Sequence, residues 1–286
     1  MKVVAPHDAK VVRIAGYGIT IPADFEISPG IVIRSNPPHH DPGVLADGCE
    51  FVGDYAGILA MQEFASLYLE IEERSGGQAL ITKAWNSMWL FHLLALGCRC
   101  PCYPLYTWSG TKSIQFAVST PHSIFQDTDS PIAASATQLV WVRSHLREFD
   151  LLLADPAFTA SLLNFANAHH LFGFESRIMQ IWAGIERLFK VSSEISRTLA
   201  LYSALVLENE SPEKRYECYK RIRKDYDIRS KVVLGALGKG VSVKDAYHRA
   251  SNLLVSLLAR CIELESVPSA DELDRASLVG FISPPI

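Results

Sequence analysis

The sequence lacks several features that would assign it to a class at once. No run approaches about 18 uninterrupted apolar residues, so we expect no membrane-spanning helix. Residues 1–8 hold too short an apolar stretch for a signal peptide. The net charge is only −4, so any basic surface for nucleic acid or a membrane must be local. We find no internal repeat. The sequence therefore predicts a cytoplasmic protein with no membrane partner.

The composition is that of a soluble globular chain. Apolar residues make up 49% and charged residues 20% of its 286 positions. This length is enough for one large domain or two ordinary ones, each with a buried core.

Six cysteines are present, and in a cytosolic chain we expect reduced thiols rather than disulfides. Cys98, Cys100 and Cys102 alternate, so on a strand they would line one face, with His92 on the helix before them. Structural zinc sites usually pair cysteines two to four residues apart and need a fourth ligand. We therefore favour buried thiols, and predict no metal and no cofactor.

Residues 1–130 are predicted to form a small α/β or α+β module. β-branched segments suggest strands, and apolar spacing of three or four residues suggests helices. The expected strands are 11–14, 18–21, 30–34, 103–108 and 114–118, and the expected helices are 54–74 and 79–96. Residues 36–43 suggest a proline-rich loop, in which His39, His40 and Asp41 fit a solvated loop better than a metal site. Residues 126–131 are the expected boundary.

Residues 131–286 are predicted to be mainly an antiparallel helical bundle. Asp155-Pro156 and Ser211-Pro212 have the character of helix starts, with proline in the first turn. The expected helices are 133–153, 155–170, 175–190, 195–207, 214–225 and 242–265. The tail, ending in Pro284 and Pro285, is expected to fray. The fold class predicted for the whole chain is therefore α+β.

One predicted helix concentrates positive charge between residues 214 and 231, with tyrosines interleaved. The residues expected to bind RNA are Lys220, Arg221, Arg223, Lys224, Lys231 and Tyr226. Two interpretations are open. The helix is either a solvated surface crossed by i,i+4 ion pairs, or a ridge where phosphates meet arginine and bases stack on tyrosine.

Residues from about 175 to 235 resemble the Apea-like branch of the HEPN superfamily. The matching segments are Ile181-Trp182-Ala183-Gly184-Ile185-Glu186-Arg187-Leu188-Phe189, Glu194-Ile195-Ser196-Arg197-Thr198-Leu199-Ala200 and Tyr226-Asp227-Ile228-Arg229-Ser230-Lys231-Val232-Val233, the last followed, after Leu234, by Gly235. The resemblance covers the C-terminal half and does not extend to residues 1–130. It implies a dimerising helical bundle that joins two Arg-x-x-x-x-His motifs in a metal-independent ribonuclease site.

That motif suits RNA cleavage by attack of the 2′-hydroxyl on the neighbouring phosphate. Histidine transfers protons near neutral pH, and arginine offers a planar fork to phosphate oxygens. By the resemblance Arg229 takes the place of the family arginine, but Leu234 stands where the family has histidine. Leucine cannot transfer a proton.

Three explanations of Leu234 are open. A toxic nuclease was disarmed during cloning, or the lineage lost catalysis and kept binding, or another residue supplies the proton. His248 is the nearest candidate in sequence for that last role. The genomic codon at position 234 separates the first explanation from the others. We predict that Leu234→His creates or restores RNA cleavage.

Two acidic residues and a tyrosine complete the predicted site. Asp227 is expected either to orient Arg229 or to cap a helix. Glu186 is expected to form an ion pair with Arg197 or Arg177 inside the bundle, or else to act in catalysis. Tyr226 fits the core better than a base-stacking surface.

We therefore expect an inactive HEPN-type endoribonuclease of the toxin or antiviral-defence kind, acting on RNA as a homodimer through the helical domain. The N-terminal module is expected to sense a trigger ligand or recruit a partner protein. The alternatives are a noncatalytic RNA-, nucleotide- or protein-binding module, and a pure helical scaffold.

Overall fold

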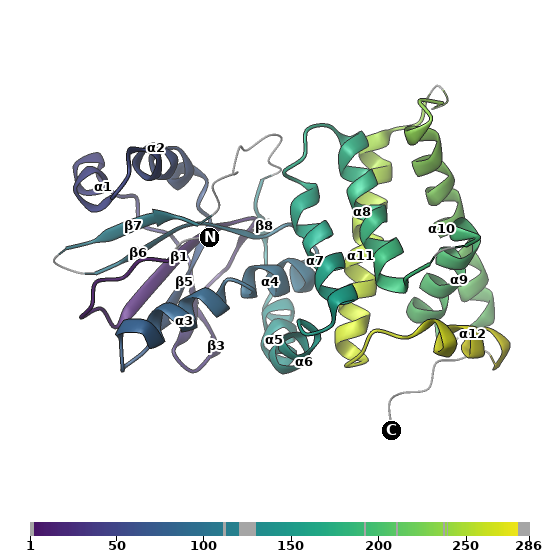
Figure 1. Ribbon diagram of the computed structural model, residues 1–286, viewed down its shortest axis with the longest axis horizontal. Coiled ribbons are helices and arrows are strands. Elements are labelled where there is room, and N and C mark those ends of the chain that lie inside the picture. Colours follow the sequence, from purple (N-terminus) through teal and green to yellow (C-terminus); the bar gives the residue numbers. More distant parts are fainter. Residues whose placement is uncertain are drawn as a thin grey trace. The chain divides into compact units, whose positions relative to one another are not determined.

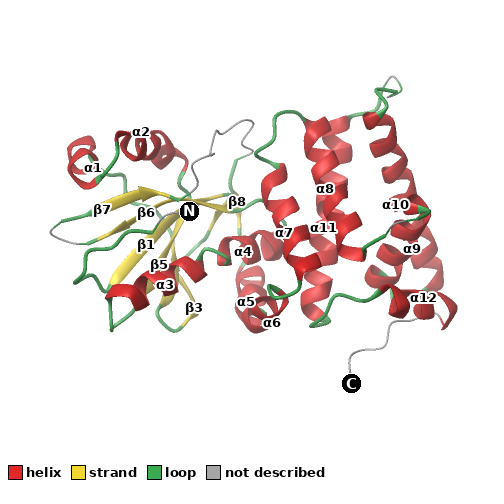
Figure 2. Cartoon of the chain, viewed as in Figure 1, coloured by secondary structure: helices red, strands yellow, loops and turns green. Residues whose placement is uncertain are grey.

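A computed structural model of the chain describes residues 3–110, 113–119, 130–191, 193–209, 211–236, 238 and 240–279. These residues divide into two compact units, Met1–Ser144 and His145–Ile286 (Figure 1). The first is a sheet with helices and the second is helical, so the chain is mixed α+β, as the sequence predicts (Figure 2).

The first unit is built on a six-stranded sheet in which every neighbouring pair is antiparallel. The strand order is β3(Phe25–Ser28), β4(Ile31–Arg34), β5(Leu67–Glu72), β1(Val11–Tyr17), β6(Tyr103–Ser109), β7(Gln115–Val118). The predicted strands at 11–14, 30–34, 103–108 and 114–118 are confirmed within one to three residues at each end.

Helices cover both faces of this sheet. On one face, α3(Gly77–Ser87) packs on β1 and β5, and α4(Leu90–Cys98) packs on β6. On the other face, α1(Pro42–Gly48) and α2(Val52–Met61) pack against the β6–β7 end (Figure 1). The short 3₁₀ helix η1(Gln62–Phe64) follows α2.

Two helix predictions in this unit are wrong in detail. The expected helix 54–74 ends at Met61, and β5 takes its second half. Leu67, Leu69 and Ile71 are fully buried while the residues between them are half-buried, which is the two-residue period of a strand. The expected helix 79–96 is interrupted between Ser87 and Leu90, giving α3 and α4.

The unit boundary falls later than the predicted 130/131. A short strand, β8(Ile132–Ala133), pairs with β2(Ile19–Thr20), and α5(Ala136–Ser144) packs on α4 and β3. Because these contacts tie residues 132–144 to the sheet, the unit extends to Ser144. Most of the predicted boundary, residues 126–129, lies outside the described residues.

The second unit consists of helices joined by short connections. They are α6(Leu146–Leu152), α7(Pro156–Ala168), α8(Phe174–Phe189), α9(Ile195–Leu207), α10(Pro212–Val233), α11(Val243–Glu263) and α12(Ala270–Val279). The closest pairs are α7 with α8, α9 with α10, and α8 with α11. The expected helix 133–153 is broken into α5 and α6, and α12 was not predicted.

Local sequence signals explain where α7 and α10 begin. Asp155 accepts hydrogen bonds from the amides of Ala157 and Phe158 at 2.7 and 3.0 Å. Ser211 accepts one from the amide of Lys214 at 3.3 Å, with Pro212 in the first turn. These caps satisfy amides that have no partner within the helix.

The three neighbouring cysteines are buried, as predicted, but do not lie on a strand. Cys98 ends α4, and Cys100 and Cys102 precede β6. Burial raises the pKa of Cys98 to about 12 and lowers that of His92 to about 4. Groups held in these neutral forms fit a structural role.

Candidate functional site on helix α10

Helix α10 carries nearly all of the predicted site residues. It runs unbroken from Pro212 to Val233, so the predicted helix 214–225 and the motif around Arg229 belong to one element. Positions on a helix advance by about 100° per residue, and this rotation decides which side chains share a face. The buried residues of α10, Cys218, Ile222 and Tyr226, mark its inner face.

Arg229 lies on that inner face, in contact with a carboxylate from α8. Its Nη2 is 3.2 Å from Oε1 of Glu186, and the two side chains are 21% and 25% exposed. The Tyr226 hydroxyl donates to the same Glu186 oxygen at 3.1 Å. The Arg229 guanidinium also sits 5.3 Å from the centre of the Tyr226 ring. One carboxylate thus holds an arginine and a tyrosine from neighbouring turns of α10.

An indole closes this inner cluster. The Trp182 ring meets the Tyr226 ring edge-on at 5.1 Å, one turn before Glu186 on α8. Burial, reinforced by the Glu186 charge, raises the pKa of the Tyr226 hydroxyl above its usual range. Arg229 Nε and Trp182 Nε1 are buried and have no hydrogen-bond partner among the described residues. We call Trp182, Glu186, Tyr226 and Arg229 the inner cluster.

The structure corrects the expected partners of Glu186. Arg197 pairs with Glu194 at 3.1 Å, and Arg177 donates to the Leu171 carbonyl at 2.9 Å. Neither forms the predicted ion pair, because Arg229 takes that place. The sequence does show that Trp182 and Glu186, four residues apart, share one face of a helix, as do Tyr226 and Arg229, three residues apart. It does not show that the two pairs meet, because their contact depends on the packing of α8 on α10.

Leu234 lies at the end of α10, exposed to solvent. It is the C-cap residue and is 77% exposed. The Gly235 amide donates to the Val232 carbonyl at 3.1 Å, and the Ala236 amide to the Lys231 carbonyl at 2.9 Å. With Gly235 at φ 63°, these two bonds form a Schellman motif that fixes the helix end. Five residues place Leu234 about 140° around the axis from Arg229.

Asp227 takes neither of the roles predicted for it, whereas Tyr226 lies in the core, as the sequence favoured, and not on an RNA-binding surface. Asp227 is exposed in the middle of α10, so it caps no helix end. Two residues of helix also turn it about 160° away from Arg229, so it does not orient that side chain. Tyr226 is only 6% exposed and bonded to Glu186, so its ring cannot stack on a base.

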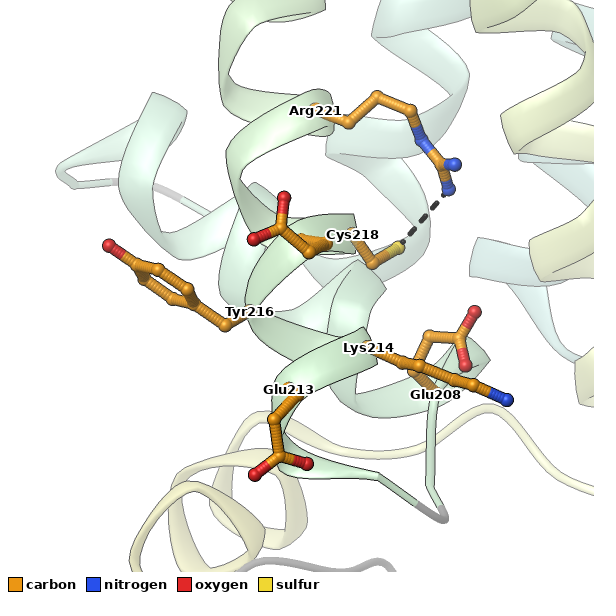
Figure 3. A pocket seen from close by; sticks show the side chains of 7 residues that line it. Glu208, Glu213, Lys214, Tyr216, Cys218 and Arg221 are labelled. Atoms are coloured by element: carbon orange, nitrogen blue, oxygen red, sulfur yellow. Dashed lines mark hydrogen bonds between the residues drawn. The ribbon is translucent and has the colours of Figure 1, made fainter.

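The remaining predicted RNA-binding residues divide between two sides of α10. Lys220, Arg223, Lys224 and Lys231 are exposed on the face opposite the inner cluster. Arg221 instead lies on another side of the helix, where its Nη2 contacts Cys218 Sγ at 3.5 Å. Figure 3 shows Tyr216 on one side of α10 and Cys218 and Arg221 on the other.

A pocket of about 650 Å³ lies along the start of α10 (Figure 3). Its lining includes Glu208, Glu213 and Glu217 together with Lys214 and Arg221. Carboxylates outnumber cations there, so the pocket does not favour a phosphate.

His248 lies outside the inner cluster. Its ring packs against Tyr247 at 5.2 Å and Phe174 at 6.2 Å. Phe174 begins α8, twelve residues or about 18 Å of helix before Glu186. The explanation that His248 replaces the missing proton carrier therefore gains no support from the geometry.

Within the described residues, no group of three or more histidine, cysteine or acidic side chains is placed to hold a metal ion. None of the helices described is long and apolar enough to cross a membrane. Comparison of the chain with protein-family models, curated proteins and solved structures gave no significant match.

Proposed function

We propose that the C-terminal unit is a HEPN-type RNA-directed domain that lacks cleavage because Leu234 replaces the proton carrier. The observation that carries the proposal is the placement of Arg229. Glu186 and Tyr226 fix this arginine in a partly open position, where its side chain is 21% exposed. A fixed, partly exposed guanidinium suits a phosphate oxygen.

Leu234 supplies the other half of the argument. It stands five residues after Arg229 on a fixed helix end, where a histidine side chain would reach solvent. Leucine offers no group that takes or gives a proton near neutral pH. We therefore propose binding without turnover for this chain.

Arg229 and residue 234 point in directions about 140° apart on one helix. A phosphate contacted by both residue types is more easily reached by Arg229 of one copy and residue 234 of another. The proposal therefore includes a homodimer through the helical unit, as the family resemblance implies.

The test is RNA cleavage by the full-length Leu234→His variant in buffer containing a chelator. We expect cleavage by this variant and none by the parent chain or by Leu234→Gln, which is polar but carries no titrating group. Adding Arg229→Ala to Leu234→His should abolish the gain. A purified, folded Leu234→His protein that cleaves no RNA and is not toxic would contradict the proposal.

A noncatalytic nucleotide- or protein-binding module is the alternative. One observation favours this alternative: Arg229 Nη2 already forms an ion pair with Glu186, so that nitrogen is not available to a phosphate. This alternative predicts no cleavage from any substitution at position 234.

A further inference from the structure

Tyr216 on the outer face of α10 stacks on the half-buried Tyr219 at the flank of the helix, with two cations beside the pair. The Tyr216 and Tyr219 rings lie 6.3 Å apart at an angle of 15°. Lys220 Nζ sits 4.8 Å from the centre of the Tyr216 ring, and Arg223 Nη1 donates to the Tyr219 hydroxyl at 3.3 Å. We call these four residues the tyrosine ladder. Spacings of three and four residues make them one continuous surface.

Exposure sets this ladder apart from core packing. The Tyr216 side chain is 60% exposed, whereas Tyr226 on the same helix is 6% exposed. Tyr219 is half-buried, and the exposed Tyr216 ring stacked on it buries little area against the bundle and so adds little to its stability. An ordinary solvated helix face needs charge but not a pair of aligned rings.

Positive charge is concentrated on the same helix. From residue 212 to 233 the chain has eight basic and four acidic residues, a net charge of +4. The whole chain carries −4, so the remainder carries −8. Two of the four acids are paired, Glu217 with Lys220 at 2.6 Å and Asp225 with Arg249 at 2.8 Å.

The ion pair on the ladder is replaceable. Lys220 and Glu217 have side chains 48% and 70% exposed, and surface pairs of this kind add little stability. Lys224 and Lys231 extend the ladder toward the helix end, and neither pairs with an acid in the described part of the chain. A phosphate backbone along this face would therefore meet several available cations.

From these contacts we propose that the tyrosine ladder binds single-stranded RNA, with bases stacked on Tyr216 and Tyr219 and phosphates held by Lys220, Arg223 and Lys224. Exposed bases of a single strand can reach a flat ring, whereas those of a duplex are already stacked on one another. RNA is anionic, so it is complementary to the net positive charge of α10, although the chain as a whole is net negative.

This inference rests on the proposed function for its choice of RNA, but it uses a different surface. Tyr216 lies about 140° and Lys220 about 180° around α10 from Arg229, while Tyr219, about 80° from Arg229, lies at the flank of the helix. The ladder therefore binds the strand on the outer face, independently of the inner cluster. The two ideas can fail separately.

The test is a fluorescence-anisotropy titration of the full-length chain with three labelled probes at low and moderate salt. The probes are a 12-nucleotide oligouridine, the DNA of matching length, and a duplex RNA. We expect the single strands to bind more tightly than the duplex. Tyr216→Ala/Tyr219→Ala should weaken binding of the oligouridine at least about tenfold, because base stacking is lost. Tyr216→Phe/Tyr219→Phe keeps both rings and should bind within about twofold of the parent.

Lys224→Gln should weaken binding to both single strands. It should also reduce the slope of log affinity against log salt concentration by about 1, the value for one lost phosphate contact. The ladder proposal is overturned if the double alanine variant binds oligouridine as the parent does, if the duplex is preferred, or if the phenylalanine variant loses as much as the alanine variant. No RNA binding at all would overturn it too, and would indicate a protein partner for this face.

Two further variants separate this proposal from the proposed function. Binding that survives in Arg229→Ala supports the ladder even if Leu234→His shows no cleavage. Cleavage by Leu234→His that is unaffected by the double alanine substitution supports the inner site and overturns the ladder as its RNA-binding surface.

Discussion

The inner and outer faces of α10 use the same residue types for opposite purposes. On the inner face Tyr226 is buried and Arg229 is fixed by one carboxylate of α8. On the outer face Tyr216 and Arg223 stand in solvent beside Tyr219. Tyr216 and Tyr226 are about 80° apart around the helix axis, and Arg223 and Arg229 about 120° apart. Side chains of the same type thus serve packing on one side of α10 and form a charged aromatic surface on the other. The composition of α10 alone does not show which tyrosines and arginines are buried and which are exposed.

The largest difference between the faces should appear in a matched pair of tyrosine substitutions. Tyr226→Ala removes a buried ring that packs on Trp182, so we expect a loss of about 3 kcal/mol or more. Tyr216→Ala removes an exposed ring and should change stability by less than about 0.5 kcal/mol. Chemical denaturation followed by circular dichroism measures both. Equal losses would break the comparison.

A matched pair of arginine substitutions should show a smaller difference. Arg229→Met removes a charged hydrogen bond to Glu186 in a partly buried site, and we expect a loss of about 1–2 kcal/mol. Arg223→Met, on the outer face, should stay within about 0.5 kcal/mol. Combining Arg229→Met with Glu186→Gln in a double-mutant cycle should give a clear coupling energy. A coupling near zero would mean that Glu186 does not hold Arg229.

The helix end can be tested with a pair of glycines. Gly235 has φ +63°, where a side chain meets no neighbouring atom but strains the backbone. Gly235→Ala should therefore cost about 1 kcal/mol. Gly238 is equally open but lies outside the left-handed region, so Gly238→Ala should cost less. Equal stabilities of the two variants in thermal unfolding would argue against the helix end described here.

Alkaline pH should reveal the smallest effect. The pKa of Tyr226 is raised above 10.0 by burial and by Glu186. The unfolded tyrosine ionises first, so this contribution is complete below pH 10 and is lost as pH rises through the folded pKa. Parent and Tyr226→Phe should differ by about 1 kcal/mol at neutral pH, where the hydrogen bond to Glu186 is intact. Denaturation at several pH values should show that difference shrinking above pH 10.

Local signals predicted most elements of the helical unit, and for a physical reason. Helix α9 is found at the predicted 195–207, and α8 and α11 are within two residues of their expected ends. These helices have strong apolar periodicity, and α7 and α10 have the recognisable starts Asp155-Pro156 and Ser211-Pro212. The sheet was harder, because Leu67–Glu72 also fits a helical spacing, and only its pairing with β1 and β4 decides for a strand.

The candidate site was predicted only in part. The sequence marked Arg229, Glu186 and Leu234, but it could not show that Glu186 and Arg229 touch, since they are 43 positions apart and meet only through tertiary packing. It also grouped Tyr226 and Arg221 with the exposed lysines. The rotation of the helix assigns those two to other sides, and the Tyr216–Tyr219 stack went unpredicted despite its i,i+3 spacing.

We propose that α10 carries an RNA-cleavage site that is complete except for its proton carrier. The most direct measurement is the chemistry of the RNA ends after incubation with Leu234→His in chelator. The account predicts 2′,3′-cyclic phosphate ends that appear with this variant and disappear when Arg229→Ala is added. Intact RNA with the folded variant, or the same ends from the parent chain, would contradict it.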